Sequence, residues 1–278
     1  MIANGKQEKE GGRAMTTEKE AWQEKESSLE HRLCGIPFVQ KTVELTETDS
    51  TNRIAKELAV GGAPEGTLVV AKRQSKGKGR LGRSFFSPEG GIYMSMVLRP
   101  KISAEKALLI TTCGAVAVAR AIERVSGCTT GIKWVNDIFV NGRKVCGILA
   151  EAGLSGNTEY PDYVVLGIGI NVKQQSVPEE LKNIVGCLED TAQSHISNEE
   201  LIVAVWEEFA MLYQNLSTAV YMEEYKARSI LIGREVTVLA AEGDYRAVVT
   251  DIDKDGHLII ERDGREFGLS CGEVSVRL

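Results

Sequence analysis

The chain has 278 residues and a formal net charge of −6, with 43% hydrophobic and 26% charged residues. These values are typical of a globular protein with one large domain, or a large and a small one. The longest strongly apolar stretch, 107–119, is too short to span a bilayer, and the charged first 30 residues contain no secretory signal. We therefore expect a cytoplasmic protein that does not enter membranes.

The cysteine and histidine patterns exclude two further classes. Six cysteines are scattered without a C-x-x-C pair, which argues against a disulfide framework and against a zinc site. We expect them to be buried, reduced thiols. Three histidines lie far apart in polar stretches, which argues against histidine-dependent nucleophilic catalysis.

The N-terminal segment differs from the rest of the chain. Residues 1–30 carry seven acids and five bases with few hydrophobic residues, so we predict a disordered tail over 1–32. Ser50 is then a candidate N-cap for a helix that Gly61-Gly62 would end. The β-branched stretches 67–71 and 91–98 predict strands.

The middle of the chain alternates helix and strand signals. A long buried helix is predicted at 103–125, with Ser103 as its cap and Gly127 as its end. The run 132–140 and the run 144–151 flank Asn141-Gly142, which indicates a type I′ hairpin. A central strand is expected at 163–172, followed by helices at 198–216 and 220–231.

The sequence pattern changes at Gly233. Short alternating strands are predicted at 236–239, 245–252, 257–260 and 266–269, which is typical of a small β-barrel-like domain. The segment 233–278 has six basic and ten acidic residues, so it is a poor partner for nucleic acid. We predict an α+β protein with domains at 33–231 and 232–278, and a nucleic-acid-binding module is a weaker alternative.

A basic loop is the strongest functional signal. Between Lys72 and Arg83 there are six basic residues, three glycines and no acid. Glycines let the main chain approach a ligand closely, and arginine offers a bidentate fork to phosphate. The loop lacks the G-x-x-x-x-G-K-[ST] pattern, so any phosphate site here would be an unconventional one. A solvated surface loop is the alternative for this segment alone.

Four other motifs carry polar or glycine residues at positions that a ligand could use. TDSTN (48–52) opens a helix, KWVND (133–137) combines four chemical types, KVCGIL (144–149) starts an apolar strand with lysine, and GIGIN (167–171) places two glycines in a strand. Helix capping, a core tryptophan and a hairpin-edge lysine are the ordinary explanations for these segments. Each signal alone is moderate.

The order and spacing of the five motifs together resemble the bacterial biotin protein ligases, over about 45–175 and then through the C-terminal segment. The resemblance implies a mixed central sheet of the class II aminoacyl-tRNA synthetase type with flanking helices, and an SH3-like C-terminal barrel. It implies that biotin and ATP form biotinyl-5′-AMP, and that a lysine of a biotin carboxyl carrier protein then takes the biotin. It also implies Mg²⁺, which offsets anionic repulsion in the first step.

The resemblance also implies roles for individual residues. Arg80, Lys144 and Asp137 would be catalytic, and Asp137 would also meet the metal. Biotin would be bound by Ser50, Thr51, Asn52, Gln74, Gly77, Lys78, Arg80, Lys144 and Gly147. ATP would be bound by Lys78, Arg80, Arg83, Phe85, Lys133, Asn136, Lys144 and Asn171. The glycines at 90–91, 147 and 167–169 would leave room for the fused rings of biotin.

Some features depart from the family pattern or limit it. Val135 replaces a usual proline, Leu81 a frequent cation and Phe85 a frequent tryptophan. Only 48 residues precede Asp49, so we expect a monofunctional ligase without the DNA-binding domain and operator binding of some relatives. Pairing of edge strands into a homodimer is a further expectation. A lipoate ligase or octanoyltransferase is the nearest alternative activity.

Overall fold

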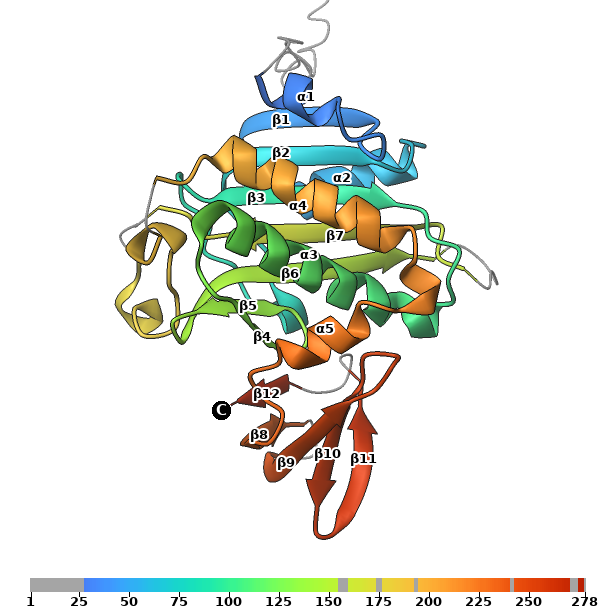
Figure 1. Ribbon diagram of the computed structural model, residues 1–278. Coiled ribbons are helices and arrows are strands. Elements are labelled where there is room, and N and C mark those ends of the chain that lie inside the picture. Colours follow the sequence, from blue (N-terminus) through green and yellow to red (C-terminus); the bar gives the residue numbers. More distant parts are fainter. Residues whose placement is uncertain are drawn as a thin grey trace, which may run out of the picture.

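The computed structural model describes residues 28–154, 160–173, 177–192, 195–240, 243–270 and 275–277. A large sheet with helices on both faces carries a second, smaller sheet beside one of its edges (Figure 1). The predicted α+β architecture, with a mixed central sheet and a small C-terminal β unit, is confirmed.

The large sheet has seven strands in the order β1-β2-β3-β7-β6-β5-β4. β1 and β2 are parallel, and all other neighbours are antiparallel. The interior strand β3 is buried at every position because both of its faces are covered, and the strand predicted to be central is β7 in the middle of the sheet. The strands are β1 (Lys41–Thr48), β2 (Thr67–Gln74), β3 (Ile92–Leu98), β4 (Gly131–Lys133), β5 (Asp137–Val140), β6 (Arg143–Gly153) and β7 (Tyr163–Ile170).

Helices cover the two faces unequally (Figure 1). One face carries α3 (Leu108–Ser126) with α4 (Asn198–Tyr213) packed beside it, and the main hydrophobic core lies between these helices and the sheet. The other face carries α2 (Thr51–Val60), which packs on a smaller apolar cluster. Neighbouring residues of β2 point to opposite faces, so Leu68 joins the main core and Val69 joins the smaller cluster.

The first described helix begins within the predicted tail. Helix α1 (Ser28–Leu33) overlaps the end of that predicted tail and buries Leu29 and Leu33 in the main core. Residues 1–27 of that tail lie outside the described residues. Cys34 is exposed, contrary to the expectation for the cysteines, whereas Cys113, Cys128, Cys146 and Cys187 are buried and free. Cys271 lies outside the described residues.

Several predicted elements differ in extent. The helix predicted at 103–125 begins with the 3₁₀ turn Ala104–Ala107, and α3 then runs to Ser126, where Gly127 ends it with φ 69°. The helix predicted at 198–216 already ends at Tyr213. The helix predicted at 220–231 is only α5 (Met222–Ala227), because the chain then leaves the helix to pair with β4.

The smaller sheet has the strand order β11-β10-β9-β8-β12 and is antiparallel throughout. Its inner face buries Val236, Val249, Ile252, Leu258 and Ile260. Four strands correspond to the predicted ones, and β12 was not predicted. The strands are β8 (Glu235–Leu239), β9 (Tyr245–Ile252), β10 (Leu258–Arg262), β11 (Arg265–Leu269) and β12 (Ser275–Arg277).

None of the helices in the described part of the chain has the length and apolarity needed to cross a membrane.

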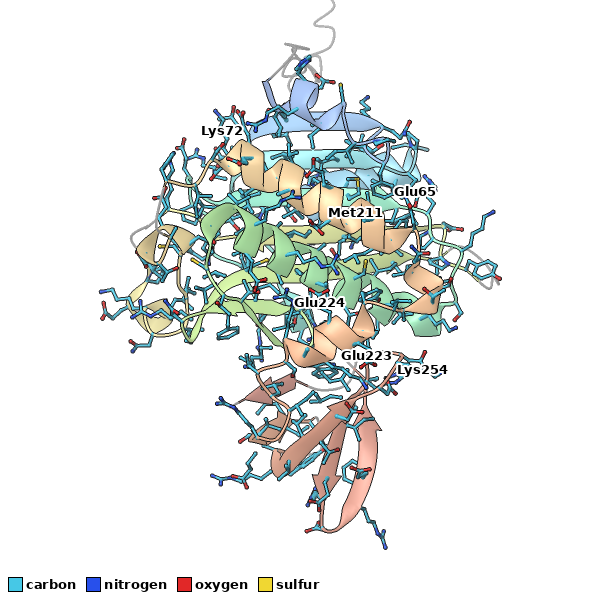
Figure 2. All side chains as sticks on the ribbon, viewed as in Figure 1. Glu65, Lys72, Met211, Glu223, Glu224 and Lys254 are labelled. Atoms are coloured by element: carbon cyan, nitrogen blue, oxygen red, sulfur yellow. The ribbon has the colours of Figure 1, made fainter. Side chains whose placement is uncertain are left out.

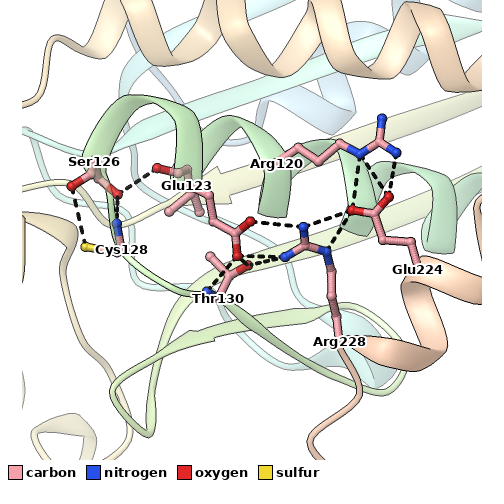
Figure 3. Close-up of polar contacts among 8 residues, drawn as sticks. Arg120, Glu123, Ser126, Cys128, Thr130, Glu224 and Arg228 are labelled. Atoms are coloured by element: carbon pink, nitrogen blue, oxygen red, sulfur yellow. Dashed lines mark hydrogen bonds and ion pairs between the residues drawn. The ribbon is translucent and has the colours of Figure 1, made fainter.

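A charged cluster joins α3 to α5 (Figure 3). Glu224 accepts hydrogen bonds from Arg120 (Nε to Oε2, 3.0 Å) and from Arg228 (Nε to Oε1, 2.9 Å). Arg228 also donates to Glu123, which in turn accepts from the backbone N–H of Thr130. The cluster therefore fixes α5, and the chain that follows it, against α3.

Replacing Glu224 with glutamine is expected to lower the free energy of unfolding by about 2 kcal/mol at pH 7, because two arginines lose a partly buried partner. The neighbouring Glu223 is exposed (Figure 2), and Glu223→Gln is the matched control with an expected change below about 0.5 kcal/mol. Urea denaturation of the two variants measures both values.

The same cluster predicts a pH dependence. Burial raises the pKa of Glu224, but hydrogen bonds from Arg120 and Arg228 outweigh it and leave the pKa below its ordinary value of 4.5. A carboxylate with a lowered folded pKa stabilises the fold above pH 4.5 and loses this contribution as the pH falls through the folded pKa. The stability difference between wild type and Glu224→Gln should therefore shrink in acid, and a constant difference would contradict the assignment.

Candidate active site

A cavity of about 160 Å³ opens on the α2 side of the large sheet, at the ends of β2 and β4 to β7. It brings together all but two of the residues to which the sequence analysis assigned a catalytic, biotin-binding or ATP-binding role. The candidates that line it are Ser50, Thr51, Asn52, Gln74, Lys78, Arg80, Arg83, Phe85, Lys133, Asn136, Asp137, Lys144 and Gly147.

The other two candidates lie elsewhere. Gly77 forms the neck of the basic loop, where its carbonyl accepts from the N–H of Phe85 (2.8 Å) and where a side chain would overlap Phe85 O and Ser87 Oγ. Asn171 lines a second cavity of about 400 Å³, together with Arg143 and Lys173. Gly77 therefore shapes the loop, and the nucleotide role expected for Asn171 stays a prediction.

One end of the cavity is polar and uncharged. The N-terminus of α2 lies here, and Gln74 Oε1 accepts from the backbone N–H of Thr51 (2.8 Å). Gln74 Nε2 in turn donates to Ser87 Oγ (3.0 Å). The Ser50 side chain makes no capping hydrogen bond, and Gln74 satisfies the N–H of Thr51, one of the N–H groups at the start of α2 that have no partner within the helix.

Two residues behind this end were missed by the sequence analysis. Ser95, on the fully buried β3, places its hydroxyl 2.7 Å from Thr51 Oγ1 and 2.6 Å from Asn52 Oδ1. Glu151, on β6, accepts from Asn52 Nδ2 (2.7 Å). Both lie inside strands, where the sequence pattern indicated only burial, so no local signal set them apart.

Glu151 is held ionised by its neighbours. Burial raises its pKa, but hydrogen bonds from Lys56 and Asn52 outweigh this effect and leave the pKa below its ordinary value. The carboxylate therefore remains a charged acceptor behind the polar end of the cavity at neutral pH.

The opposite end of the cavity is cationic. Lys144 Nζ lies 2.7 Å from Asp137 Oδ1 and 5.9 Å from the centre of the Phe85 ring. The hairpin at Asn141-Gly142, both with positive φ as a type I′ turn requires, pairs β5 with β6 and so brings Lys144 beside Asp137. Lys78, Arg80, Arg83 and Lys133 add positive charge to the same walls.

Glycines make room for side chains in this structure. A Cβ at Gly147 would lie 2.9 Å from the Phe85 ring, and one at Gly169 would lie 2.5 Å from it. A Cβ at Gly167 would overlap Asn52 Oδ1. The space that the resemblance assigned to biotin rings thus holds Phe85 and Asn52, and the cavity is smaller than the roughly 300–1,000 Å³ common for ligand pockets. A ligand of biotin's size requires Phe85 and its loop to move.

Gly167→Ala is expected to weaken binding of any ligand at the polar end at least tenfold, because the new methyl group displaces the Asn52 amide. Gly35→Ala is the control for glycine replacement, since Gly35 is exposed, lacks a left-handed φ and would bring its methyl group no closer than 3.8 Å to any neighbour. Isothermal titration calorimetry of the variants with biotin, the ligand that the resemblance implies, measures the effect. Equal affinity in Gly167→Ala and wild type would show that Asn52 does not shape the site.

The basic loop folds back on itself over the cavity. Lys78 and Ser84 form an isolated antiparallel bridge, and Leu81 and Gly82 turn the loop with positive φ values of 55° and 72°. Leu81 is 58% exposed at the tip. Arg80 Nη1 donates to Asn136 Oδ1 (3.2 Å), and this side-chain contact ties the loop to the opposite wall of the cavity.

The KWVND segment is a turn between β4 and β5, which divides the single strand predicted at 132–140. The Trp134–Val135 peptide bond in it is cis. Asn136 is fixed on the β6 side, where its Nδ2 donates to Ile148 O (2.8 Å). The rest of the turn is held from the C-terminal part of the chain, because Tyr225 donates to Val135 O (2.9 Å) and Trp134 Nε1 donates to Gly256 O (2.9 Å).

Comparison with known proteins gives consistent results. Residues 44–171 match the biotin/lipoate A/B protein ligase family, and 231–277 match the biotin protein ligase C-terminal domain. The bifunctional ligase/repressor BirA of Bacillus subtilis is 38% identical over 218 residues, which cover 76% of this chain and 66% of BirA. The biotin–[acetyl-CoA-carboxylase] ligase of Paracoccus denitrificans is 30% identical over 245 residues, which cover 83% of this chain and 98% of that protein.

Solved structures agree with these relatives. Biotin protein ligase from Aquifex aeolicus in complex with biotin and ATP is similar to this chain with a TM-score of 0.72 and 28% identity, over 86% of this chain and 99% of that one. A point mutant of the same enzyme in complex with biotin has a TM-score of 0.73 and 29% identity, over 86% of this chain and 98% of the mutant.

Proposed function

The chain belongs to the biotin/lipoate A/B protein ligase family, and from this premise we propose that it is an ATP-dependent biotin ligase. Its substrates are biotin and ATP, and its acceptor is a lysine of the biotin carboxyl carrier protein of acetyl-CoA carboxylase. The observation that carries the proposal is a cavity with an uncharged polar end and a cationic end. Biotin has a neutral ureido head and an anionic valerate tail, and the tail must meet the triphosphate of ATP.

In the first step the biotin carboxylate attacks the α-phosphorus of ATP, and pyrophosphate leaves. Two anions must approach each other, and Lys144 with the arginines of the basic loop offsets their repulsion. Asp137 holds the Lys144 ammonium by the ion pair at 2.7 Å, so the charge is positioned before the substrates arrive. In the second step the amine of the carrier lysine attacks the acyl carbon, and AMP leaves.

The acyl-adenylate is also open to attack by water. The basic loop, with Arg80 on Asn136, would cover it until the carrier lysine replaces the loop. Both steps proceed by direct attack of a substrate group, so they require no nucleophile of the protein.

Magnesium would enter with ATP. In the described residues no group of three or more histidine, cysteine, aspartate or glutamate side chains could hold a metal ion. Mg²⁺ in phosphoryl chemistry is commonly bound by one or two carboxylates together with phosphates and water, and Asp137 in the cavity wall fits that pattern. The ion would neutralise phosphate charge there.

Incubation of the protein with biotin, Mg-ATP and a carrier domain, read by avidin blot, tests the activity. We expect biotin-dependent pyrophosphate exchange and carrier labelling. Exchange that depends on lipoate and not on biotin would replace the proposal with the lipoate alternative. A salt-dependent gel shift at low micromolar protein would instead support the nucleic-acid alternative. The cytoplasmic location, the domain limits 33–231 and 232–278, and homodimerisation through edge strands stay predictions.

A further inference from the structure

We propose that Asp253, in the turn between β9 and β10, is a positioning residue for the cationic end of the cavity, because its carboxylate aims the Gly256 carbonyl at the indole N–H of Trp134. Trp134 lines the cavity, whereas Asp253 is not among the lining residues and acts on the substrate site only through Trp134. The smaller sheet thus contributes to the affinity for ATP, and this part of the inference rests on the proposed function. The hydrogen-bond path itself does not depend on it.

The turn between β9 and β10 is built around the Asp253 carboxylate. Its Oδ1 accepts from the backbone N–H groups of Asp255 (2.9 Å) and His257 (2.8 Å), and its Oδ2 lies 2.8 Å from His257 Nδ1. Aspartate is favoured at the start of a turn because its short side chain reaches these backbone groups. Gly256 follows with a left-handed φ of 87°, which glycine adopts without strain. The Asp253 side chain therefore holds the turn in one shape.

A single peptide group connects Asp253 to Trp134. The N–H of His257 and the carbonyl of Gly256 belong to the same planar trans peptide, in which the two groups point in opposite directions. Asp253 Oδ1 accepts from the N–H on one side, and Trp134 Nε1 donates to the carbonyl on the other side at 2.9 Å. The contact with Asp253 therefore fixes the direction of the acceptor that Trp134 meets.

Trp134 depends on this acceptor because it is buried. The residue is 4% exposed, so its indole N–H needs a partner inside the protein. The turn that supplies the partner is seated on α3, where a Cβ at Gly256 would lie 3.3 Å from the Leu108 side chain and 3.4 Å from that of Thr112. A displaced Gly256 carbonyl would leave the indole N–H unsatisfied, and the indole would have to move.

A movement of the indole would reach the groups that position two cations. Trp134 is followed closely by Asn136 and Asp137, and both lie in the cavity wall. Asn136 accepts from Arg80 at 3.2 Å, and Asp137 pairs with Lys144 at 2.7 Å. The path from Asp253 therefore ends at the cationic end of the cavity and not at the polar end.

Asp253→Ala tests the path in pyrophosphate exchange. The variant loses the acceptor for both N–H groups, so KM for ATP should rise about tenfold, while KM for biotin stays within about twofold. Asp253→Asn should restore KM for ATP to within about twofold of wild type, since the amide oxygen accepts from the same N–H groups. Asp255→Ala is the matched control, because it removes from the same turn an acid that pairs with the exposed Lys254 at 3.8 Å, and it should leave both KM values unchanged.

NMR spectroscopy of the indole N–H groups tests the same path without any substrate. The chain has three tryptophans, and Trp134→Phe identifies the signal of Trp134. In Asp253→Ala this signal should move toward that of a free indole N–H, and its exchange with solvent should accelerate at least tenfold. Asp253→Asn and Asp255→Ala should retain the wild-type signal.

Trp134→Phe keeps an aromatic ring but removes the donor, so it should by itself raise KM for ATP about tenfold and spare KM for biotin. On this background, Asp253→Ala should raise KM for ATP no further. If Asp253→Ala does not fold at the assay temperature, which a thermal melt reports, Trp134→Phe and Asp253→Asn decide the outcome.

Five results would overturn the inference. These are an unchanged Trp134 signal in Asp253→Ala, an unchanged KM for ATP in Asp253→Ala or in Trp134→Phe, equal increases in KM for ATP and biotin, an Asp253→Asn variant that behaves like Asp253→Ala, or full additivity with Trp134→Phe. Each leaves the proposed function intact if wild type shows biotin-dependent exchange. Absence of that exchange in wild type would overturn the proposed function, and the NMR signal of Trp134 would still decide the hydrogen-bond path.

Discussion

Lys144→Ala should lower kcat/KM for biotin-dependent pyrophosphate exchange by about 10²–10³-fold, which is the usual effect of removing one positioned group that stabilises developing charge. Two physical terms act in the same direction. The variant loses a cation next to the reacting phosphate, and it leaves the carboxylate of Asp137 without its partner at 2.7 Å, facing anionic substrates. The fold should persist, because Lys144 lies at the start of β6 and its backbone hydrogen bonds to Ile184 and Gly186 do not depend on its side chain.

The control for this loss is Lys254→Ala, which removes an 89% exposed lysine from the turn between β9 and β10. It should leave exchange unchanged. Thermal melts of both variants separate lost chemistry from lost structure. Exchange in Lys144→Ala within about threefold of wild type, with a normal melt, would refute the assignment of Lys144.

Arg80→Gly should increase the rate at which the acyl-adenylate leaves the enzyme by about 100-fold, while its formation is reduced less. The expectation follows from the side-chain contact that ties the loop to the opposite wall, Arg80 Nη1 to Asn136 Oδ1 at 3.2 Å. Without it the loop loses this anchor and one cation that attracts the phosphate. Rapid filtration of enzyme loaded with labelled biotin and ATP measures the release rate.

Lys76→Gly is the matched control for Arg80→Gly. It also adds a glycine to the basic loop and removes a cation, but Lys76 is exposed and does not line the cavity. Release from Lys76→Gly should stay close to that of wild type. Equal acceleration in the two variants would show that loop flexibility alone governs release and that the Arg80 anchor is unnecessary.

The sequence predicted those features of the fold that depend only on a few neighbouring residues. Gly127 ends α3 in a left-handed conformation, and Asn141-Gly142 forms the hairpin turn, because both depend on backbone preferences of one or two residues. The extent of α5 depends instead on a distant partner. Ile230 donates to Ile132 O, and this pairing takes the chain out of the helix that its own composition favours.

In the site, too, features with a local cause were predicted and features that depend on distant partners were not. The residues that were assigned a catalytic, biotin-binding or ATP-binding role converge in one cavity except for Gly77 and Asn171, because motif spacing reflects chemistry that must meet in space. Ser95 and Glu151 escaped prediction because a polar residue inside a strand has no distinctive local pattern. The filling of the glycine spaces by Phe85 and Asn52 could not be read from the sequence either, since it depends on how α2 and the basic loop pack on β6 and β7.

The hydrogen bonds that hold the KWVND turn have a consequence for folding during synthesis. Every cavity-lining residue lies between positions 50 and 169, yet the turn is held by Tyr225 and Gly256. Ribosomes synthesise a chain from its N-terminus, so the residues that line the cavity leave the exit tunnel before Tyr225 and Gly256, which hold the turn. We therefore expect the full set of contacts that hold the turn to form only after residue 256 has left the exit tunnel.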